Sequence, residues 1–331
     1  MLVIKEVNLM TVVEHMLGKR EQISISDAES AYGTVATPVI VLGRNATFDP
    51  NRNNQNVTEV PSTGAGTLDV EAREFGQEDW GGVLSWSPQD WRFLKFALLD
   101  VSSDVTDTST GPTTHTFTNA TAGLLSFTME RAIRATTDRV RTYEGCQMDQ
   151  LALSWDSGAA GNFLQAQANI IAEDCNNGTS RTEITAPTTE AFKPRHVQLT
   201  LEGGVVAYLK SGTFTITNGL SDGRYANSDL ERVKGESSQT TRKYNLTAVA
   251  EYVDDTFFDM LDSADILAST NTLVFNRGTN DTLTVTFTGA YLNKASDPTV
   301  VGGKNLVTLN LGINSAAFVA VDALTNYETF S

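Results

Sequence analysis

The sequence predicts an all-β protein with minor helical content. Short segments along the chain alternate apolar and polar residues with a period of two, which is typical of strands with one buried face. Because parallel strands buried on both faces read as unbroken apolar runs, this alternation indicates antiparallel sheets. With 40% hydrophobic and 19% charged residues among 331, the chain carries enough apolar side chain to fold into compact domains.

Six segments show the alternation most clearly. In the segment 282–291, Leu283, Val285 and Phe287 share one face while threonines occupy the other. The predicted strands are 124–130, 151–155, 163–170, 244–252, 282–291 and 306–313. Each presents one apolar face to a core and one polar face to its surroundings.

Two helices interrupt the strands. Ser87 and Pro88 form an N-cap and first-turn pair, and the apolar run behind them predicts a helix over about 88–99. The second helix begins near Asp254, whose carboxylate can cap it, and it has apolar residues at helical spacing as far as Leu267.

The two halves of the chain repeat the same order of parts. Each half has a strand, a long polar loop, a second strand, a helix and then several alternating strands. This order predicts two related β modules, at 28–190 and 191–331, preceded by an N-terminal arm or helix at 1–27.

The long polar loops lie at about 49–66 and 219–240. Structureless connections beyond about 12–15 residues are uncommon inside compact domains, so we expect other subunits to hold them. Their mixed charges suit pairing across a subunit boundary, although a solvated loop has the same composition. The predicted inter-ring or inter-subunit residues are Asp49, Arg52, Asn56, Asp222, Arg224, Asp229 and Arg232.

Charge and composition argue against several kinds of function. A net charge of -16 does not favour tight binding of nucleic acid, which requires a positive field. The three histidines, His15, His115 and His196, are scattered, so no histidine-based catalytic or metal site is predicted. No nucleotide-binding glycine motif occurs. We therefore expect no enzyme activity, cofactor or metal, and no membrane insertion. Cys146 and Cys175 are expected to be unpaired buried thiols, and they could form a disulfide only if the fold brought their Cα atoms within about 7 Å.

Three segments carry a resemblance to a known family. Residues 29–34 (ESAYGT), followed by Ala36-Thr37-Pro38 and Leu42-Gly43, resemble the start of tail tube proteins from long, non-contractile phage tails. The block 212–220 (GTFTITNGL) is similar to that family's strand leading into a long loop. The segment 305–328 is similar to its closing strands. The likeness covers residues 28–331.

The resemblance implies a structural subunit of a siphovirus-type tail tube, located in the virion tail and assembled in the host cytoplasm. It implies tandem sandwich or small-barrel modules whose copies form stacked rings, as a trimeric pseudo-hexamer or a hexamer. Partners would be its own copies, a tape-measure protein, a tail tip or baseplate protein and a tail terminator. DNA would pass through the channel without specific binding. A distal tail or decoration protein, or a carbohydrate-binding β-sandwich, has a similar composition.

Polar strand faces are the candidate channel surface. Short neutral side chains would line a wet surface without gripping phosphate, although a solvent-facing sheet has the same pattern. The predicted channel-facing residues are Gln165, Gln167, Asn169, Thr284, Thr286 and Thr288.

Overall fold

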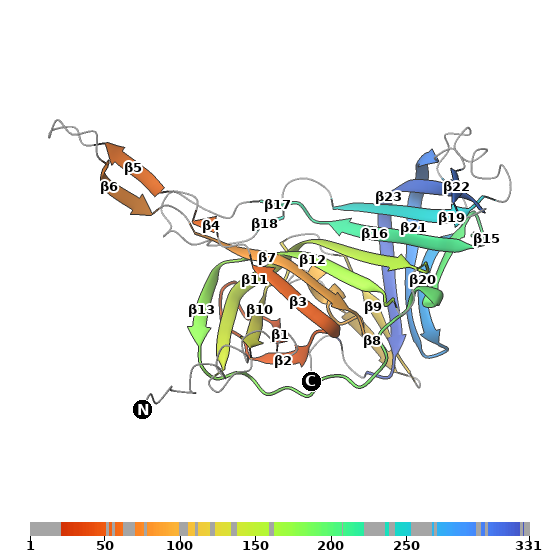
Figure 1. Ribbon diagram of the computed structural model, residues 1–331. Coiled ribbons are helices and arrows are strands. Elements are labelled where there is room, and N and C mark those ends of the chain that lie inside the picture. The colour runs from red at the N-terminus through yellow and green to blue at the C-terminus, as the bar shows by residue number, and fades with distance from the viewer. Residues whose placement is uncertain are drawn as a thin grey trace, which may run out of the picture.

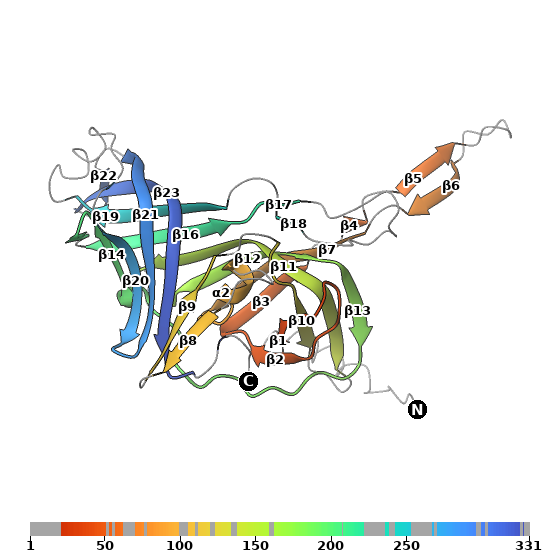
Figure 2. The same cartoon turned by 180° about the vertical axis from the view of Figure 1, so that it is seen from behind.

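The computed structural model shows an antiparallel β protein with minor helix, so the predicted fold class is confirmed. The structure describes residues 21–327 except 51–52, 55–56, 62–69, 76–77, 99–104, 110–111, 120–122, 134–137, 159–161, 207, 222–235, 238–241, 253–266, 268–269, 296–298, 302–303 and 325–326. Figures 1 and 2 show its strands in two layers, called here the upper layer and the lower layer by their place in Figure 1.

The first half of the chain supplies strands to both layers. Its lower-layer order is β2–β1–β10–β11–β13, and its upper-layer order is β3–β7–β12–β11. The bounds are β1 Glu21–Ala28, β2 Pro38–Val41, β3 Arg44–Pro50, β7 Glu78–Ser87, β10 Phe127–Ile133, β11 Arg139–Asp156, β12 Gln165–Ala172 and β13 Asp174–Gly178. Strand β1 thus includes residues 21–27, which were predicted to belong to the N-terminal arm or helix.

Strand β11 belongs to both layers because it bends. Gly145 has a φ of +60°, a conformation that residues with a Cβ rarely adopt. A Cβ at this position would also lie 2.8 Å from the Cβ of Glu173. As far as Cys146 the strand pairs with β10 and β13, and from Gln147 on it pairs with β12. The glycine therefore lets one strand pass from the lower layer to the upper.

The second half has the same two-layered arrangement. Its lower-layer order is β15–β14–β20–β21–β23, and its upper-layer order is β16–β19–β23–β21. The bounds are β14 Val197–Leu201, β15 Gly204–Val205, β16 Leu209–Thr217, β19 Lys243–Glu251, β20 Asn271–Gly278, β21 Asp281–Ala295, β22 Thr299–Val301 and β23 Lys304–Asp322. In Figure 1, β16 and β19 run across the view while β20, β21 and the end of β23 descend from them.

The halves are joined by direct strand pairing. β11 pairs with β16 from Gln150↔Thr217 to Asp156↔Ser211, which makes the upper layer continuous. A hairpin of β8 (Val105–Ser109) and β9 (Thr113–Phe117) adds to the other side of β23. The buried apolar residues of both halves form one core cluster.

Aromatic side chains fill the space between the layers. Phe48 of β3 meets Tyr143 of β11 with ring centroids 5.0 Å apart, and Phe214 of β16 meets Phe287 of β21 at 5.9 Å. Each pair joins an upper-layer strand to the lower-layer part of a bent strand. Edge-to-face and stacked pairs of this kind add to the stabilisation from area burial.

The predicted helix over 88–99 is shorter than expected. Helix α2 spans Leu94–Leu98, and residues 88–93 form turns instead. Tertiary hydrogen bonds occupy the backbone of this turn: Phe192 donates its N–H to Pro88 O at 3.0 Å, and Trp91 donates its N–H to the hydroxyl of Tyr327 at 3.1 Å. The helix predicted from Asp254 lies outside the described residues.

The six predicted strands are present, but the prediction of two structureless loops was partly wrong. The loop at 49–66 contains β4 (Asn53–Asn54) and β5 (Val57–Pro61), and β5 pairs with β6 (Val70–Phe75). This β5–β6 hairpin extends away from the layered body in both views (Figures 1 and 2). The loop at 219–240 contains the short pair β17 (Leu220–Ser221) and β18 (Glu236–Ser237).

Candidate channel and assembly surface

The outer face of the upper layer presents aligned polar residues. Strand pairing places Gln167, Ala152, Thr215 and Asn245 in one row across four strands. A parallel row consists of Gln165, Ser154, Thr213, Thr247 and Asn310. These positions alternate with buried ones along every strand. The two rows carry no charged residue and together make a continuous neutral face, called here the polar face.

Side chains on the outer side of the upper layer bond to each other across strands. The hydroxyls of Ser154 and Thr213 lie 3.0 Å apart, and Asn169 Nδ2 donates to Gln150 Oε1 at 3.0 Å. At the next pair of strands, Thr247 Oγ1 donates to Asn310 Oδ1, also at 3.0 Å. Cross-strand pairs of this kind contribute to the stability of the sheet.

The structure separates the two predicted channel-facing groups. Gln165 and Gln167 lie on β12 with exposed side chains in the two rows of the polar face, and Asn169 is exposed on the same side of β12 in the adjacent row. Thr284 and Thr286 pair with Val319 and Ala317 on the lower part of β23, before the bend of β21. Thr288 precedes that bend too. The threonine group therefore lies on the lower layer and does not join the glutamine group.

Of the predicted inter-subunit residues, the structure describes Asp49 alone. Its side chain is exposed on β3, in line with Asn169 through the pairing of β3 with β7 and of β7 with β12. The remaining six, Arg52, Asn56, Asp222, Arg224, Asp229 and Arg232, lie outside the described residues. Their role stays a prediction.

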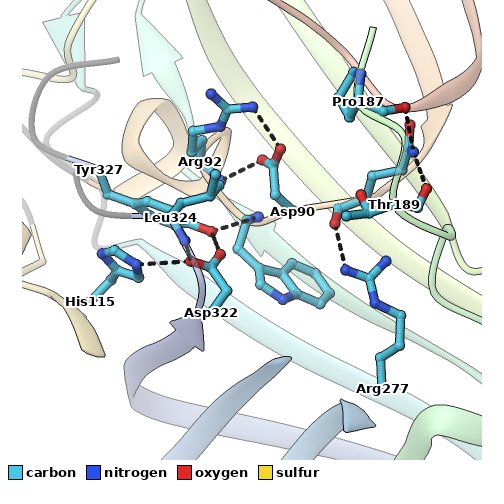
Figure 3. A network of polar contacts seen from close by, with 11 residues as sticks. Asp90, Arg92, His115, Pro187, Thr189, Arg277, Asp322, Leu324 and Tyr327 are labelled. Carbon is cyan, nitrogen blue, oxygen red and sulfur yellow. Dashed lines mark hydrogen bonds and ion pairs between the residues drawn. The ribbon is translucent and has the colours of Figure 1, made fainter. Parts of the chain in front are cut away.

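A buried polar cluster near residue 322 was not predicted from the sequence. His115 Nε2 lies 3.1 Å from Asp322 Oδ1, and Tyr327 donates its hydroxyl to Asp322 Oδ2 (Figure 3). The rings of His115 and Tyr327 are stacked with centroids 3.7 Å apart. All three residues are buried. His115 lies on β9, and only the fold brings it to a residue 207 positions away.

The cluster fastens the last strand to the turn between β7 and α2. Leu324 donates its N–H to Asp322 Oδ1 at 2.8 Å, and the backbone of Trp91 bonds to Tyr327. Beside it, Arg277 donates to the backbone oxygen of Gln89 at 3.0 Å, and Gln89 donates to Pro187 O at 3.1 Å (Figure 3). These contacts join β20, the turn and the segment between β13 and β14.

Burial raises the pKa of one residue of the cluster and of one thiol. Desolvation raises the pKa of Tyr327 well above its ordinary value, with Asp90 and Asp322 adding to the rise. Desolvation also raises the pKa of Cys146 well above its ordinary value. Cys146 and Cys175 are not joined by a disulfide. The Cys146 thiol is therefore poorly suited to act as a nucleophile, because the reactive form is the thiolate.

The described part of the chain contains no group of three or more His, Cys, Asp or Glu residues that could hold a metal ion. No helix within that part is long and apolar enough to span a membrane.

Comparison with known proteins gives the family. No curated protein matches the chain. A family model described as "Phage tail tube protein" matches residues 18–319, a span that includes both layered halves and the strand pairing between them. The fold and this match agree with the resemblance of the segments at 29–43, 212–220 and 305–328. The chain belongs to the phage tail tube protein family, and its role is that of a structural component of a viral tail tube.

Proposed function

We propose that this tail tube protein assembles with its own copies into stacked rings, and that the polar face lines a channel through which DNA is delivered. The observation that supports the lining most directly is the alignment of neutral side chains in two rows across the upper layer. The long loops that contain Asp49, Arg52, Asn56, Asp222, Arg224, Asp229 and Arg232 would contact neighbouring subunits.

A neutral lining suits transport of a polyanion. Lys and Arg side chains hold phosphates by displacing condensed counterions, so each one on the wall would slow the passage of DNA. The two rows of the polar face carry amide and hydroxyl side chains and one alanine. The net charge of -16 further opposes retention of DNA by the subunit as a whole.

The proposal includes the partners of such a tube. Rings of this protein would grow on a tail tip or baseplate protein, enclose a tape-measure protein before ejection, and end at a tail terminator. The tail would be of the long, non-contractile type, assembled in the host cytoplasm. The subunit would have no enzymatic role.

Charge introduced on the polar face tests the lining. We expect the double variant Gln167→Lys with Thr215→Lys to form tubes of normal diameter but to release DNA several times more slowly. The measurement is the time course of DNA ejection from virions, with tubes imaged by electron microscopy. The double variant Gln167→Ser with Thr215→Ser is the matched neutral control and should eject DNA at the normal rate.

A second lysine variant tests the lower-layer threonines as the alternative channel surface. The variant Thr284→Lys with Thr286→Lys introduces the same charge on the other predicted channel surface. Slow ejection in that variant, with normal ejection in the Gln167 and Thr215 variant, would assign the channel to the lower layer. Normal ejection in both lysine variants would contradict the electrostatic argument.

A further inference from the structure

The two halves of the chain correspond strand by strand. In each half a lower-layer strand pairs with a short neighbour, as β1 does with β2 and β14 does with β15. The upper-layer orders β3–β7–β12–β11 and β16–β19–β23–β21 also match position for position. Strand β10 corresponds to β20, and β12 with β13 corresponds to β23.

The irregularities of the strands coincide as well. Gly289 in β21 has a φ of +64°, and a Cβ there would lie 3.0 Å from the Cβ of Asn314. Gly145 has the same conformation in β11 and faces Glu173 in the same way. Tyr143 and Phe287, which stand two residues before these glycines, both pack against an upper-layer phenylalanine.

Register shifts fall at equivalent places. The pairing of β11 with β12 shifts between Met148 and Gln150, and that of β21 with β23 shifts between Leu292 and Lys294. A second shift lies near the start of β3 and near the start of β16, in their pairings with β7 and β19. Because bulges are specified locally, their coincidence at several positions indicates one module present twice.

Because the module occurs twice, the strand pairing that joins the two halves serves as a template for the strands at the equivalent positions. Inside the chain, the end of β11 pairs with β16, which joins the first module to the second. The counterpart of β16 in the first module is β3. The counterpart of the end of β11 in the second module is the end of β21 continued by β22, whose residues pair with the start of β23.

Both counterparts are open edges. Within the described ranges, β3 pairs only with β7, and β22 pairs only with β23. They stand at opposite ends of the upper layer, so one cannot close on the other within a single chain. An open edge presents a row of unpaired N–H and C=O groups that another strand can meet.

We propose that a second copy of this chain occupies each edge, β22 of one copy pairing antiparallel with β3 of the next in the register of β11 with β16. The contact is head-to-tail and closes into a ring. Since each chain brings two modules, three chains complete a ring of six modules with alternating intrachain and interchain pairings. This inference rests on the proposed tube function and identifies the lateral partner surface of its channel.

The template also specifies which residues meet. Ser154 of β11 pairs with Gln165 of β12 on one side and with Thr213 of β16 on the other. Asn169 and Asn310 are counterparts, because each is the first paired residue beyond the equivalent register shift. Gln165 lies four positions before Asn169, and residue 306 lies four positions before Asn310. Residue 306 is therefore the counterpart of Gln165. Residue 306 pairs with residue 299 of β22.

Thr299 is therefore the counterpart of Ser154. In the second module, Thr213 pairs with Thr247, and Thr247 pairs with Asn310. In the first module, Asp49 pairs with Val83 of β7, and Val83 pairs with Asn169. Asp49 is thus the counterpart of Thr213, and it stands opposite Thr299 of the neighbouring copy.

Cysteine cross-linking tests this pairing. The double variant Asp49→Cys with Thr299→Cys, made in a Cys175→Ser background, is treated in assembled tubes with a short bis-maleimide. Cys146 is buried and does not compete. We expect covalent species of two and three chains on a denaturing gel, with the ladder ending at three. Either single-cysteine variant should give no species larger than one chain.

The strand pairing inside the chain supplies the matched control. The variant Ser154→Cys with Thr213→Cys places thiols at the corresponding intrachain positions and should be bridged within one chain, which mass spectrometry of its peptides detects. A variant with Asp49→Cys and Ser315→Cys keeps one thiol and moves the other from β22 to an exposed position on β23. It should give no ladder.

The outcomes separate this inference from the proposed function. Tubes that form normally but give no Asp49–Thr299 ladder would overturn the pairing and leave the tube role standing. A ladder that extends to six chains would overturn the ring of three. Unmodified tubes imaged by cryo-electron microscopy provide an independent count, in which a strict sixfold ring of identical chains contradicts the inference. Failure of the purified protein to polymerise at all would count against both.

Discussion

Single buried side chains hold the end of the chain in place. Asp322 is within hydrogen-bonding distance of His115 and accepts hydrogen bonds from Leu324 and Tyr327, while the hydroxyl of Tyr327 accepts one from Trp91. A buried carboxylate is tolerated only where such partners replace water. The cluster therefore acts as a fastening between β9, β23 and the turn after β7.

Removing one hydroxyl from this cluster should destabilise the whole fold. The variant Tyr327→Phe keeps the ring stacked on His115 but removes a donor to Asp322 and an acceptor for Trp91. We expect a loss of about 1–3 kcal/mol in the free energy of unfolding, measured by urea denaturation. Tyr208→Phe is the control, because Tyr208 is 69% exposed, and it should change stability by less than about 0.5 kcal/mol. Equal stabilities of the two variants would contradict the fastening role.

Among the elements, the β5–β6 hairpin differs from all others in its position. It extends from the body, and in the described part of the chain its two strands pair only with each other. An isolated two-stranded hairpin is at best marginally stable in water. A hairpin of this kind is suited to gain its support from a neighbouring subunit.

Replacing residues 57–75 with a short Gly-Ser linker should uncouple folding from stacking. Within the described residues, β5 and β6 pair only with each other, so we expect the thermal midpoint to move by less than about 3 °C. Ring stacks should disappear in electron micrographs. An equally long Gly-Ser insertion at the exposed turn of Thr279 and Asn280 is the control and should leave stacking intact. Normal tubes without the hairpin would show that stacking uses other surfaces.

The whole molecule carries several buried acidic protons that are lost at high pH. Desolvation is the largest cause of a raised pKa at Cys146, Tyr143, Tyr244 and Tyr327. In the unfolded chain these groups ionise near their ordinary values, about 8.5 for Cys and 10 for Tyr. Above those values the folded state holds more protons than the unfolded state, so stability falls as pH rises.

We therefore expect the free energy of unfolding to decline progressively as the pH rises above about 8. Urea denaturation at pH 7.5, 9.5 and 10.5 measures this decline. Tyr327→Phe should show a shallower decline above pH 10 than the unsubstituted protein, because one of the buried protons is then missing. A stability that does not change between pH 7.5 and 10.5 would contradict burial as the cause of the raised values.

Strand faces were predictable and strand partners were not. The alternation in 244–252 and 306–313 correctly identified which residues of β19 and β23 are buried. It contained no sign that these two strands pair with each other. Likewise, the apolar run after Pro88 predicted a longer helix than α2, because its local pattern does not show that Trp91 bonds to Tyr327, 236 positions away.

The candidate channel surface shows the same division. The polar side of β12 was apparent from Gln165, Gln167 and Asn169, but Thr284 and Thr286 have an equally polar pattern and lie on the lower layer. The difference arises at Gly289, where β21 bends from one layer to the other. A glycine in a strand pattern indicates a bend or a close approach only in general terms.

By itself, the sequence determined the fold class, the inward face of most strands and the likeness to tail tube proteins, because these follow from local periodicity and local motifs. The tertiary structure decided which strands pair, where β11 and β21 change layers, and which edges stay open. Those features depend on contacts between residues far apart in the chain, whose free energies are not visible in any short window. The buried His115 and Asp322 pair and the open edges of β3 and β22 belong to this second group.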